Sequence, residues 1–273
     1  MWVENLKTFR VYPSNVMMLK KFLSREMFRM AFLLPNRYFL IRCDGGKIYL
    51  NLKESVLMME KALGVYEYWK TKLFLNIVRE GMTCVDVGVD IGYYSLFFAK
   101  LMNDKGKVLS FEPNPNNCFW FRKSIQANNY KCIKLYQYAL SDKEGTATFY
   151  LGKRSGWGSF FLSQYAAAPE KKPITVKTQK LDNVLKEEGI NTVDIIKIDV
   201  EGADLLVLRG AERILKRENV KLAMDIDVKT TEEKSGLFNF LESCGFKIFG
   251  VGKELTPIER IDEKTKEIYA AKP

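Results

Sequence analysis

The chain of 273 residues contains no histidine. This absence excludes the mechanisms that depend on an imidazole, such as the Ser-His-Asp triad, the Cys-His pair and the H-E-x-x-H zinc helix. Any acid–base chemistry in this protein is therefore carried out by carboxylates, lysines or tyrosines.

Cysteine is scarce and widely spaced. The five cysteines include no C-x-x-C pair, so we do not expect a structural zinc site. Cys84 and Cys132 lie in apolar runs, and we interpret them as small core residues of a protein in a reducing compartment.

Long hydrophobic runs are also missing. A transmembrane helix needs about 20 apolar residues, and basic residues between positions 20 and 29 interrupt the longest apolar stretch. The opening sequence MWVENLKTFR lacks the basic-then-apolar layout of a signal peptide. We therefore expect a cytoplasmic protein.

Positive charge is in excess, with a net charge of +10. Residues 1–42 hold eight Lys and Arg against two Glu, which leaves +6 there. The apolar spacing predicts a helix over 14–34. Its basic row of Lys21, Arg25 and Arg29 could make peripheral contact with a membrane or an anionic substrate, but we favour a solvated face on a helix packed against the domain. The predicted apolar face consists of Leu19, Leu23, Met27, Met30 and Leu34.

Most of the chain alternates short apolar runs with helical periodicity. Near-continuous apolar strands separated by helices predict a parallel sheet covered on both faces, an α/β fold. One hairpin, around Asp44, precedes them and a second closes the chain. We divide the chain into an N-terminal helix and hairpin extension, 1–64, and a larger domain, 65–273. The expected strands are 83–88, 107–113, 134–140, 193–200 and 221–227.

The stretch CVDVGVDIGYYS places two glycines and two carboxylates between an expected strand and an expected helix. Gly88 lets the backbone turn tightly, and Gly92 lets a ligand approach the helix N-terminus. Glu112 ends the next strand, 26 positions after Asp86, close to the offset of about 20 at which an acidic residue holds ribose hydroxyls. The G-x-x-x-G spacing and Asp90 argue against a pyrophosphate, whereas these carboxylates suit a ligand with an ammonium and a sulfonium. S-adenosylmethionine is such a ligand.

Five motifs in the same order strengthen this interpretation: VDVGVDIGYYSLFFAK, FEPNPNN, ALSDKEGTATFYL, KTQKLDNVL and VDIIKIDVEGADLLVLRGA. Together they resemble the FkbM family of S-adenosylmethionine-dependent methyltransferases over 65–273. The resemblance implies a class I, Rossmann-like methyltransferase fold. Its sheet would have seven strands with helices on both faces, parallel except for the last strand.

The resemblance also implies positions for the cofactor. Glu112 would hold the ribose, and Ser141 and Asp142 would lie near the adenine. Many family members carry Glu-x-His near the end of the fifth strand, where this chain has Asp225-Ile226-Asp227. The methionine side would be lined by Asp86, Gly88, Asp90 and Gly92, and Tyr93 is a further cofactor-binding candidate.

Oxygen methylation with a carboxylate base agrees best with the turn Asp199-Val200-Glu201-Gly202 after the fourth strand. Asp199 is the first candidate for the base and Glu201 the second. Lys197 would face the same side as Asp199 and lower its pKa or that of the acceptor. The alternative is that both carboxylates only cap the following helix.

A divalent metal could be held by Asp199 with either Asp225 or Asp227, because Mg²⁺ prefers oxygen ligands. Acidic residues at sheet ends often do no more than face water or cap helices, so we do not expect a metal.

The leading hypothesis for function is methylation of a hydroxyl group on a sugar, glycan or related small acceptor. Ribose methylation of RNA is an alternative suggested by the positive charge. However, no basic-aromatic RNA-binding module is evident, and we do not expect a nucleic-acid partner. A cofactor-binding scaffold without catalysis is the third hypothesis.

Overall fold

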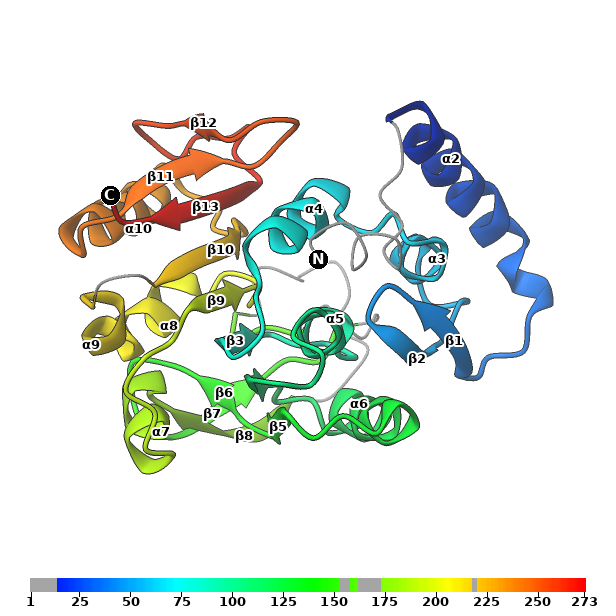
Figure 1. Cartoon of the computed structure of the whole chain (residues 1–273), viewed down its shortest axis with the longest axis horizontal. Helices are drawn as coiled ribbons and strands as arrows, with labels where there is room; N and C mark the ends of the chain where they lie inside the picture. The colour runs from blue at the N-terminus through cyan, green and yellow to red at the C-terminus, as the bar shows by residue number, and fades with distance from the viewer. Residues whose placement is uncertain (1–13, 153–157, 162–172, 218–219) are drawn as a thin grey trace.

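The computed structural model describes residues 14–152, 158–161, 173–217 and 220–273. Its centre is an eight-stranded sheet with the order β12-β11-β13-β10-β9-β3-β4-β5 (Figure 1). Only β13 and β12 run against the other strands. The expected sheet of parallel strands closed by a hairpin is confirmed, and the short β12 brings the strand number to eight instead of seven. The strands are β3 Thr83–Val87, β4 Lys107–Phe111, β5 Ile133–Tyr136, β9 Ile195–Ile198, β10 Lys221–Asp225, β11 Lys247–Gly250, β12 Thr256–Pro257 and β13 Glu267–Ala271.

Helices cover both faces of this sheet, as the continuous apolar strands require. In Figure 1, α7 to α10 lie to the left of the sheet and α4 to α6 to its right. The structure has two main hydrophobic cores, and alternate strand residues pack into one or the other. Val85 and Ile196 belong to the first core, whereas Cys84 and Ile195 belong to the second. The helices are α4 Tyr68–Ile77, α5 Tyr93–Leu101, α6 Pro115–Asn128, α7 Leu181–Glu187, α8 Asp204–Gly210, α9 Glu212–Leu215 and α10 Thr231–Ser243.

The chain between β5 and β9 forms a separate three-stranded sheet with the order β6-β8-β7. The expected strand over 134–140 divides here, because β5 ends at Tyr136 and the chain then enters β6. This sheet has its own small core around Phe149 and Val176. Its strands are β6 Ala139–Leu140, β7 Gly145–Phe149 and β8 Ile174–Gln179.

The N-terminal part consists of helix α2 (Ser14–Met30), a 3₁₀ turn η1 (Ala31–Leu33), the hairpin β1–β2 and helix α3 (Val56–Leu63). The hairpin strands are β1 Phe39–Cys43 and β2 Gly46–Leu50. Helix α2 packs on α3, and β2 packs on α6. Buried hairpin side chains therefore join the same core as α5. The domain boundary between residues 64 and 65 stays a prediction.

Candidate functional site

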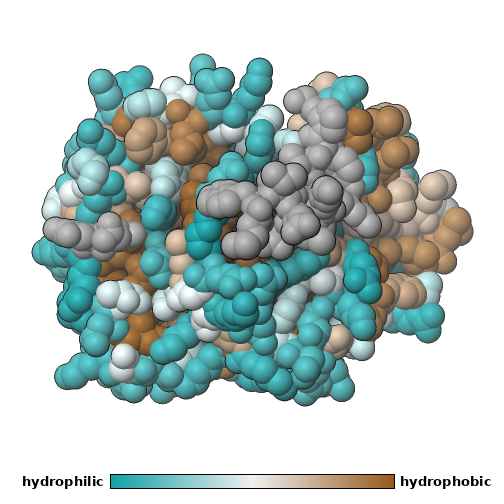
Figure 2. Space-filling model, viewed as in Figure 1, coloured by the Kyte–Doolittle hydropathy of each residue, from teal (hydrophilic) through white to brown (hydrophobic). Residues whose placement is uncertain are grey.

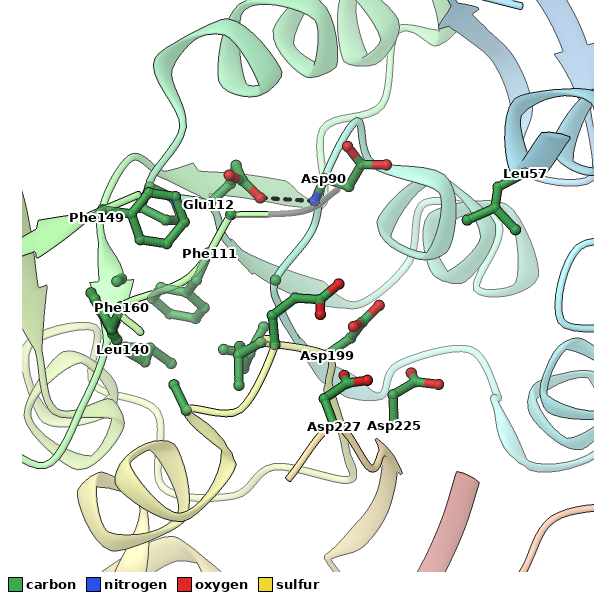
Figure 3. Close-up of a pocket in the computed structure, with 18 of the residues that line it drawn as sticks. Leu57, Asp90, Phe111, Glu112, Leu140, Phe149, Phe160, Asp199, Asp225 and Asp227 are labelled. Atoms are coloured by element: carbon green, nitrogen blue, oxygen red, sulfur yellow. Dashed lines mark hydrogen bonds between the residues drawn. The ribbon is translucent and has the colours of Figure 1, made fainter. Parts of the chain in front are cut away.

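A cleft of about 210 Å³ opens at the carboxyl ends of β3, β4, β9 and β10. Parallel α/β sheets bind ligands at this edge. Figure 3 shows two kinds of wall: apolar side chains along one side and carboxylates at one end. The apolar wall includes Phe111, Leu140, Phe149 and Phe160, and the acidic end includes Asp199, Glu201, Asp225 and Asp227.

Gly88 lies on the cleft wall, where the chain leaves β3. Its φ is +75°, and a Cβ there would lie 1.7 Å from the carbonyl oxygen of Asp199. The tight turn predicted at Gly88 is therefore present. It allows the β3 loop to approach the end of β9, which brings the first and fifth sequence motifs together.

Gly92 is required by packing, a reason that the sequence did not indicate. Its φ is +94°, and a Cβ would lie 2.0 Å from Cδ2 of Phe121 on α6. Gly92 is not among the residues that line the cleft. The space around it is taken up by the protein's own core, so packing of α6 by itself requires a glycine here, and approach of a ligand to Gly92 stays a prediction.

Asp86 and Tyr93 also lie behind the cleft wall. Asp86 accepts a hydrogen bond of 2.6 Å from Ser95 Oγ, and its Oδ1 lies 3.5 Å from Lys197 Nζ. Burial raises the pKa of Asp86. The Tyr93 hydroxyl donates to Asp44 on the turn of the hairpin. Both side chains hold the loop in place from behind.

Glu112 faces the cleft from the end of β4 and meets the β3–α5 loop (Figure 3). Its Oε2 accepts a 2.8 Å hydrogen bond from the backbone N–H of Asp90, and its Oε1 accepts one of 2.9 Å from Asn114. Burial raises the pKa of Glu112 to about 8. Glu112, the residue predicted to hold the ribose, is therefore hydrogen-bonded to the β3–α5 loop, which is predicted to line the methionine side of the cofactor.

The Asp90 carboxylate is paired on one oxygen only. Lys61 of α3 donates to Oδ2 at 2.9 Å, whereas Oδ1 is buried and has no hydrogen-bond partner among the described residues. Such an oxygen can accept a hydrogen bond from a cationic group of a ligand. Sequence reasoning did not select Lys61, because it lies in an ordinary helical pattern 29 residues away from Asp90.

Lys197 connects the loop to the acidic end of the cleft without lining it. Its Nζ donates to the carbonyl oxygen of Gly88 at 3.0 Å and lies 3.4 Å from Asp199 Oδ2. Burial alone would lower the pKa of Lys197, but the charges of Asp199 and Asp86 outweigh it and raise the pKa. The ammonium group is therefore a permanent positive charge beside Asp199, on the predicted side of the strand.

The carboxylates of the predicted metal site fall into two groups. Oxygens of Asp199, Glu201 and Asp227 lie within 4.8 Å of one another, a spacing that could hold a metal ion. Burial, reinforced by the charge of Asp199, raises the pKa of Asp227 to about 6. Asp225 instead belongs to a second group with Glu67 and Glu267. Of the two predicted pairings, Asp199 with Asp227 therefore has the spacing for a metal ion, whereas Asp225 lies in the other group.

Lys70 of α4 is the centre of that second group. This almost completely buried side chain forms ion pairs with Glu67 at 2.6 Å, with Glu267 at 3.5 Å and with Asp225. Burial would lower the pKa of Lys70, but the carboxylates of Asp225 and Glu67 raise it well above its usual range. Nothing in the sequence near Lys70 indicates this role, since Asp225 is 155 residues away.

Ser141 and Asp142 lie just outside the cleft lining. The Ser141 hydroxyl donates to Asp142 at 3.2 Å. The neighbouring Leu140 does line the cleft, together with Phe149 and Phe160. A flat aromatic ligand would therefore contact apolar side chains from the small sheet, which the sequence did not single out.

A family model described as "Methyltransferase FkbM domain" matches residues 86–248. The chain is 28% identical over 145 residues to "2-O-methyltransferase NoeI" of Sinorhizobium fredii, in an alignment that covers 49% of this chain and 58% of that protein. It is 27% identical over 161 residues to "Hexuronic acid methyltransferase AglP" of Haloferax volcanii, with 58% and 63% covered. The chain thus spans less than two thirds of either relative.

A crystal structure titled "Methyltransferase FkbM" from Methylobacillus flagellatus has a similar fold, with a TM-score of 0.50 and 14% sequence identity. The similarity covers 78% of this chain and 54% of that one. At this identity, the likeness concerns the fold alone.

Proposed function

Because this chain belongs to the FkbM family of methyltransferases, we propose that it transfers the methyl group of S-adenosylmethionine to a hydroxyl oxygen of a sugar or glycan. The observation that carries this proposal is the meeting of the Asp90 loop with Glu112 at the cleft, opposite a cluster of carboxylates. One end of the cleft is suited to a cofactor with a ribose and a cationic group. The other is suited to an acceptor with hydroxyl groups.

The donor groups around the cleft agree with this cofactor. Glu112 would accept hydrogen bonds from the ribose hydroxyls, and the unpaired Oδ1 of Asp90 would accept one from the amino group. Phe111 and Phe149 would contact the adenine through their apolar surface. When bound, S-adenosylmethionine supplies a methyl group on a positively charged sulfur, so the protein must mainly position the acceptor and take up its proton.

Asp199 is the base in this proposal. Its carboxylate takes the proton of the acceptor hydroxyl as the oxygen gains the methyl group, and Glu201 is the second candidate at the same end of the cleft. Lys197, 3.4 Å from Asp199, is a positioning residue that keeps this carboxylate aligned. The alternative is that both carboxylates only cap α8 or compensate its dipole, since α8 begins at Asp204, shortly after both residues.

The acceptor is proposed to be a neutral sugar. Two relatives are named for 2-O-methylation and for hexuronic acid methylation, which supports oxygen and sugar acceptors. Four carboxylates at the acceptor end favour uncharged hydroxyl groups, which donate hydrogen bonds to them. The same charges repel the carboxylate of a uronic acid and the phosphates of RNA, so RNA is the less favoured acceptor.

An activity assay with labelled S-adenosylmethionine tests the proposal on neutral glycosides, a hexuronate and RNA. Asp199→Asn keeps the shape of the side chain but removes proton acceptance. We expect turnover on the neutral sugar to fall by about 10²–10⁴, while the melting temperature and cofactor affinity are preserved. Asp262→Asn, in an exposed turn, is the matched control and should retain full activity.

The same assay is run with EDTA and with added Mg²⁺, because Asp199 could act as a metal ligand instead. Loss of wild-type activity on chelation, with restoration by Mg²⁺, would assign Asp199 to a metal site with Glu201 and Asp227. Wild-type turnover by Asp199→Asn would show that the base lies elsewhere. Activity on RNA alone would replace the sugar proposal.

A further inference from the structure

Helix α2 and the turn η1 expose an unusual amount of apolar surface. Seven of the twelve exposed large apolar side chains among the described residues lie there, with Phe22 58% and Leu33 73% exposed. Hydrophobic residues accordingly form the right-hand edge of the molecule in Figure 2, where Figure 1 places α2. We call these seven residues the apolar strip: Met18, Leu19, Phe22, Leu23, Met27, Met30 and Leu33.

The strip is exposed because a different side of α2, which includes Lys20 and Ser24, faces the protein. Ser24 is completely buried, and Lys20 donates to the carbonyl oxygen of Leu63 on α3 at 3.3 Å. This corrects the sequence interpretation, in which the apolar face was expected to pack against the domain. An amphipathic helix that turns its apolar face to solvent exposes a surface that needs a partner.

Cations border the apolar strip. Helix α2 carries four Lys and Arg residues against the single Glu26, a net charge of +3 (four minus one). Arg25 and Arg29 are exposed, and Arg29 pairs with Glu26 at 2.9 Å. Long basic side chains beside an apolar face are typical of helices that lie in the interface of a membrane.

We propose that α2 docks on an anionic membrane surface, with the apolar strip inserted among the lipid headgroups. The charge of the helix selects this partner, because its cations complement anionic lipids. A second copy of the chain would instead bring two sets of the same cations together, which like charges disfavour. No helix in the described ranges has both the length and the apolar character to span a bilayer, so α2 lies on the surface.

This surface lies one helix away from the cleft. Helix α2 packs on α3, and α3 supplies Leu57, Met58 and Lys61 to the cleft lining. Docking would therefore hold the cleft close to the lipid headgroups. The inference does not depend on the proposed chemistry, because it concerns where the protein lies and not which group it methylates.

Vesicle sedimentation of the full chain tests the inference. The probes are vesicles of phosphatidylcholine alone and of phosphatidylcholine with phosphatidylglycerol, each at low and high salt. We expect binding to the anionic vesicles that weakens with salt. Replacing three residues of the strip, Leu19→Gln, Phe22→Gln and Met30→Gln, should reduce binding about tenfold or more.

Charge reversal at Arg25→Glu and Lys21→Glu should also weaken binding to anionic vesicles by about tenfold or more and remove most of its salt dependence. The matched control carries Phe119→Gln and Leu255→Gln, two exposed apolar residues outside α2, and should bind like the wild type. Thermal melting of each variant checks that it folds.

Three results would overturn the inference. The first is no binding of the wild type to anionic vesicles, and the second is equal binding by the wild type and the strip variant. The third is a concentration-dependent dimer in sedimentation velocity that the strip variant abolishes, since this would assign the strip to a second copy of the chain.

Discussion

Glu112 experiences two opposite influences on its protonation. Burial raises its pKa to about 8, although N–H groups of Asn114 and Asp90 favour the ionised form. A carboxylate in the unfolded chain has a pKa of about 4.3. Because the folded state then holds the proton more tightly, the free energy of unfolding should fall as pH rises from about 4 to about 8.

Glu112→Gln tests both this linkage and the cofactor site. The variant should lose part of the fall in melting temperature between acidic and alkaline pH, because its side chain does not titrate. Calorimetry above about pH 8, where the Glu112 carboxyl group is ionised, should show S-adenosylmethionine bound at least about tenfold more weakly, since a charged acceptor of two hydroxyl groups is gone. Glu242→Gln on the exposed side of α10 is the control and should change neither quantity. An unchanged affinity in Glu112→Gln would contradict the proposed role of Glu112 in cofactor binding.

Two explanations of the glycine at position 92 can be distinguished by experiment: packing against Phe121 and approach of a ligand. Gly92→Ala should destabilise the protein by about 2–4 kcal/mol. The alanine would be strained in the left-handed backbone conformation, and its Cβ would collide with the Phe121 ring. Gly189→Ala is the matched control: its φ is +64°, but nothing lies within 4 Å of the added Cβ, so only the strain remains. Urea unfolding measures both. A stable Gly92→Ala protein that no longer binds S-adenosylmethionine would show that this position faces the cofactor after all.

At the scale of elements, one ion pair connects α3 to the β3–α5 loop. Lys61 is buried and Asp90 is only 16% exposed, so water compensates little for the loss of either partner. Removing one partner of a buried pair typically costs about 3–5 kcal/mol. The pair therefore determines how firmly the wall formed by α3 is held against the glycine loop.

A double-mutant cycle measures that connection. Lys61→Met alone should lower the free energy of unfolding by about 3 kcal/mol, because it leaves the Asp90 carboxylate without its cation. The double variant Lys61→Met with Asp90→Asn should regain a large part of this loss, since neither charge remains. The single variant Asp90→Asn completes the cycle. If the loss in the double variant equals the sum of the losses in the two single variants, the two elements are not coupled through this pair.

At the scale of the whole molecule, the N-terminal hairpin completes a core rather than lying on its surface. Leu50 and Ile48 are buried in the same hydrophobic cluster as Phe97 of α5 and Phe121 of α6. From this shared packing we expect the hairpin and the sheet to unfold as one cooperative unit. It also gives the predicted boundary between residues 64 and 65 a direct test.

Leu50→Ala should lower the free energy of unfolding of the entire chain by about 2–5 kcal/mol. Far-ultraviolet circular dichroism and tryptophan fluorescence should then report one shifted transition. Leu40→Ala, on the same hairpin but 46% exposed, should have little effect. Two separate transitions in Leu50→Ala, with only the smaller one shifted, would mean that residues 1–64 fold as an independent unit.

Local patterns in the sequence determined the α/β fold and the placement of Gly88 and Glu112 at the cleft. Strand and helix periodicity depend on neighbouring residues, and the turn at Gly88 and the position of Glu112 follow from where two strands end. Parallel strands place their carboxyl ends at one edge whatever the rest of the chain does. These features could therefore be predicted before any contact was known.

Only the tertiary structure decided which charges meet and which faces are covered. The pairing of Lys61 with Asp90, the group around Lys70 and the separation of Asp225 from Asp227 each join or divide residues through packing between elements. The orientation of α2 was decided in the same way, because either of its faces could have met α3. The physical reason is that a side chain's neighbours across the fold depend on how helices and sheet pack together, and no periodicity within a single segment contains that information.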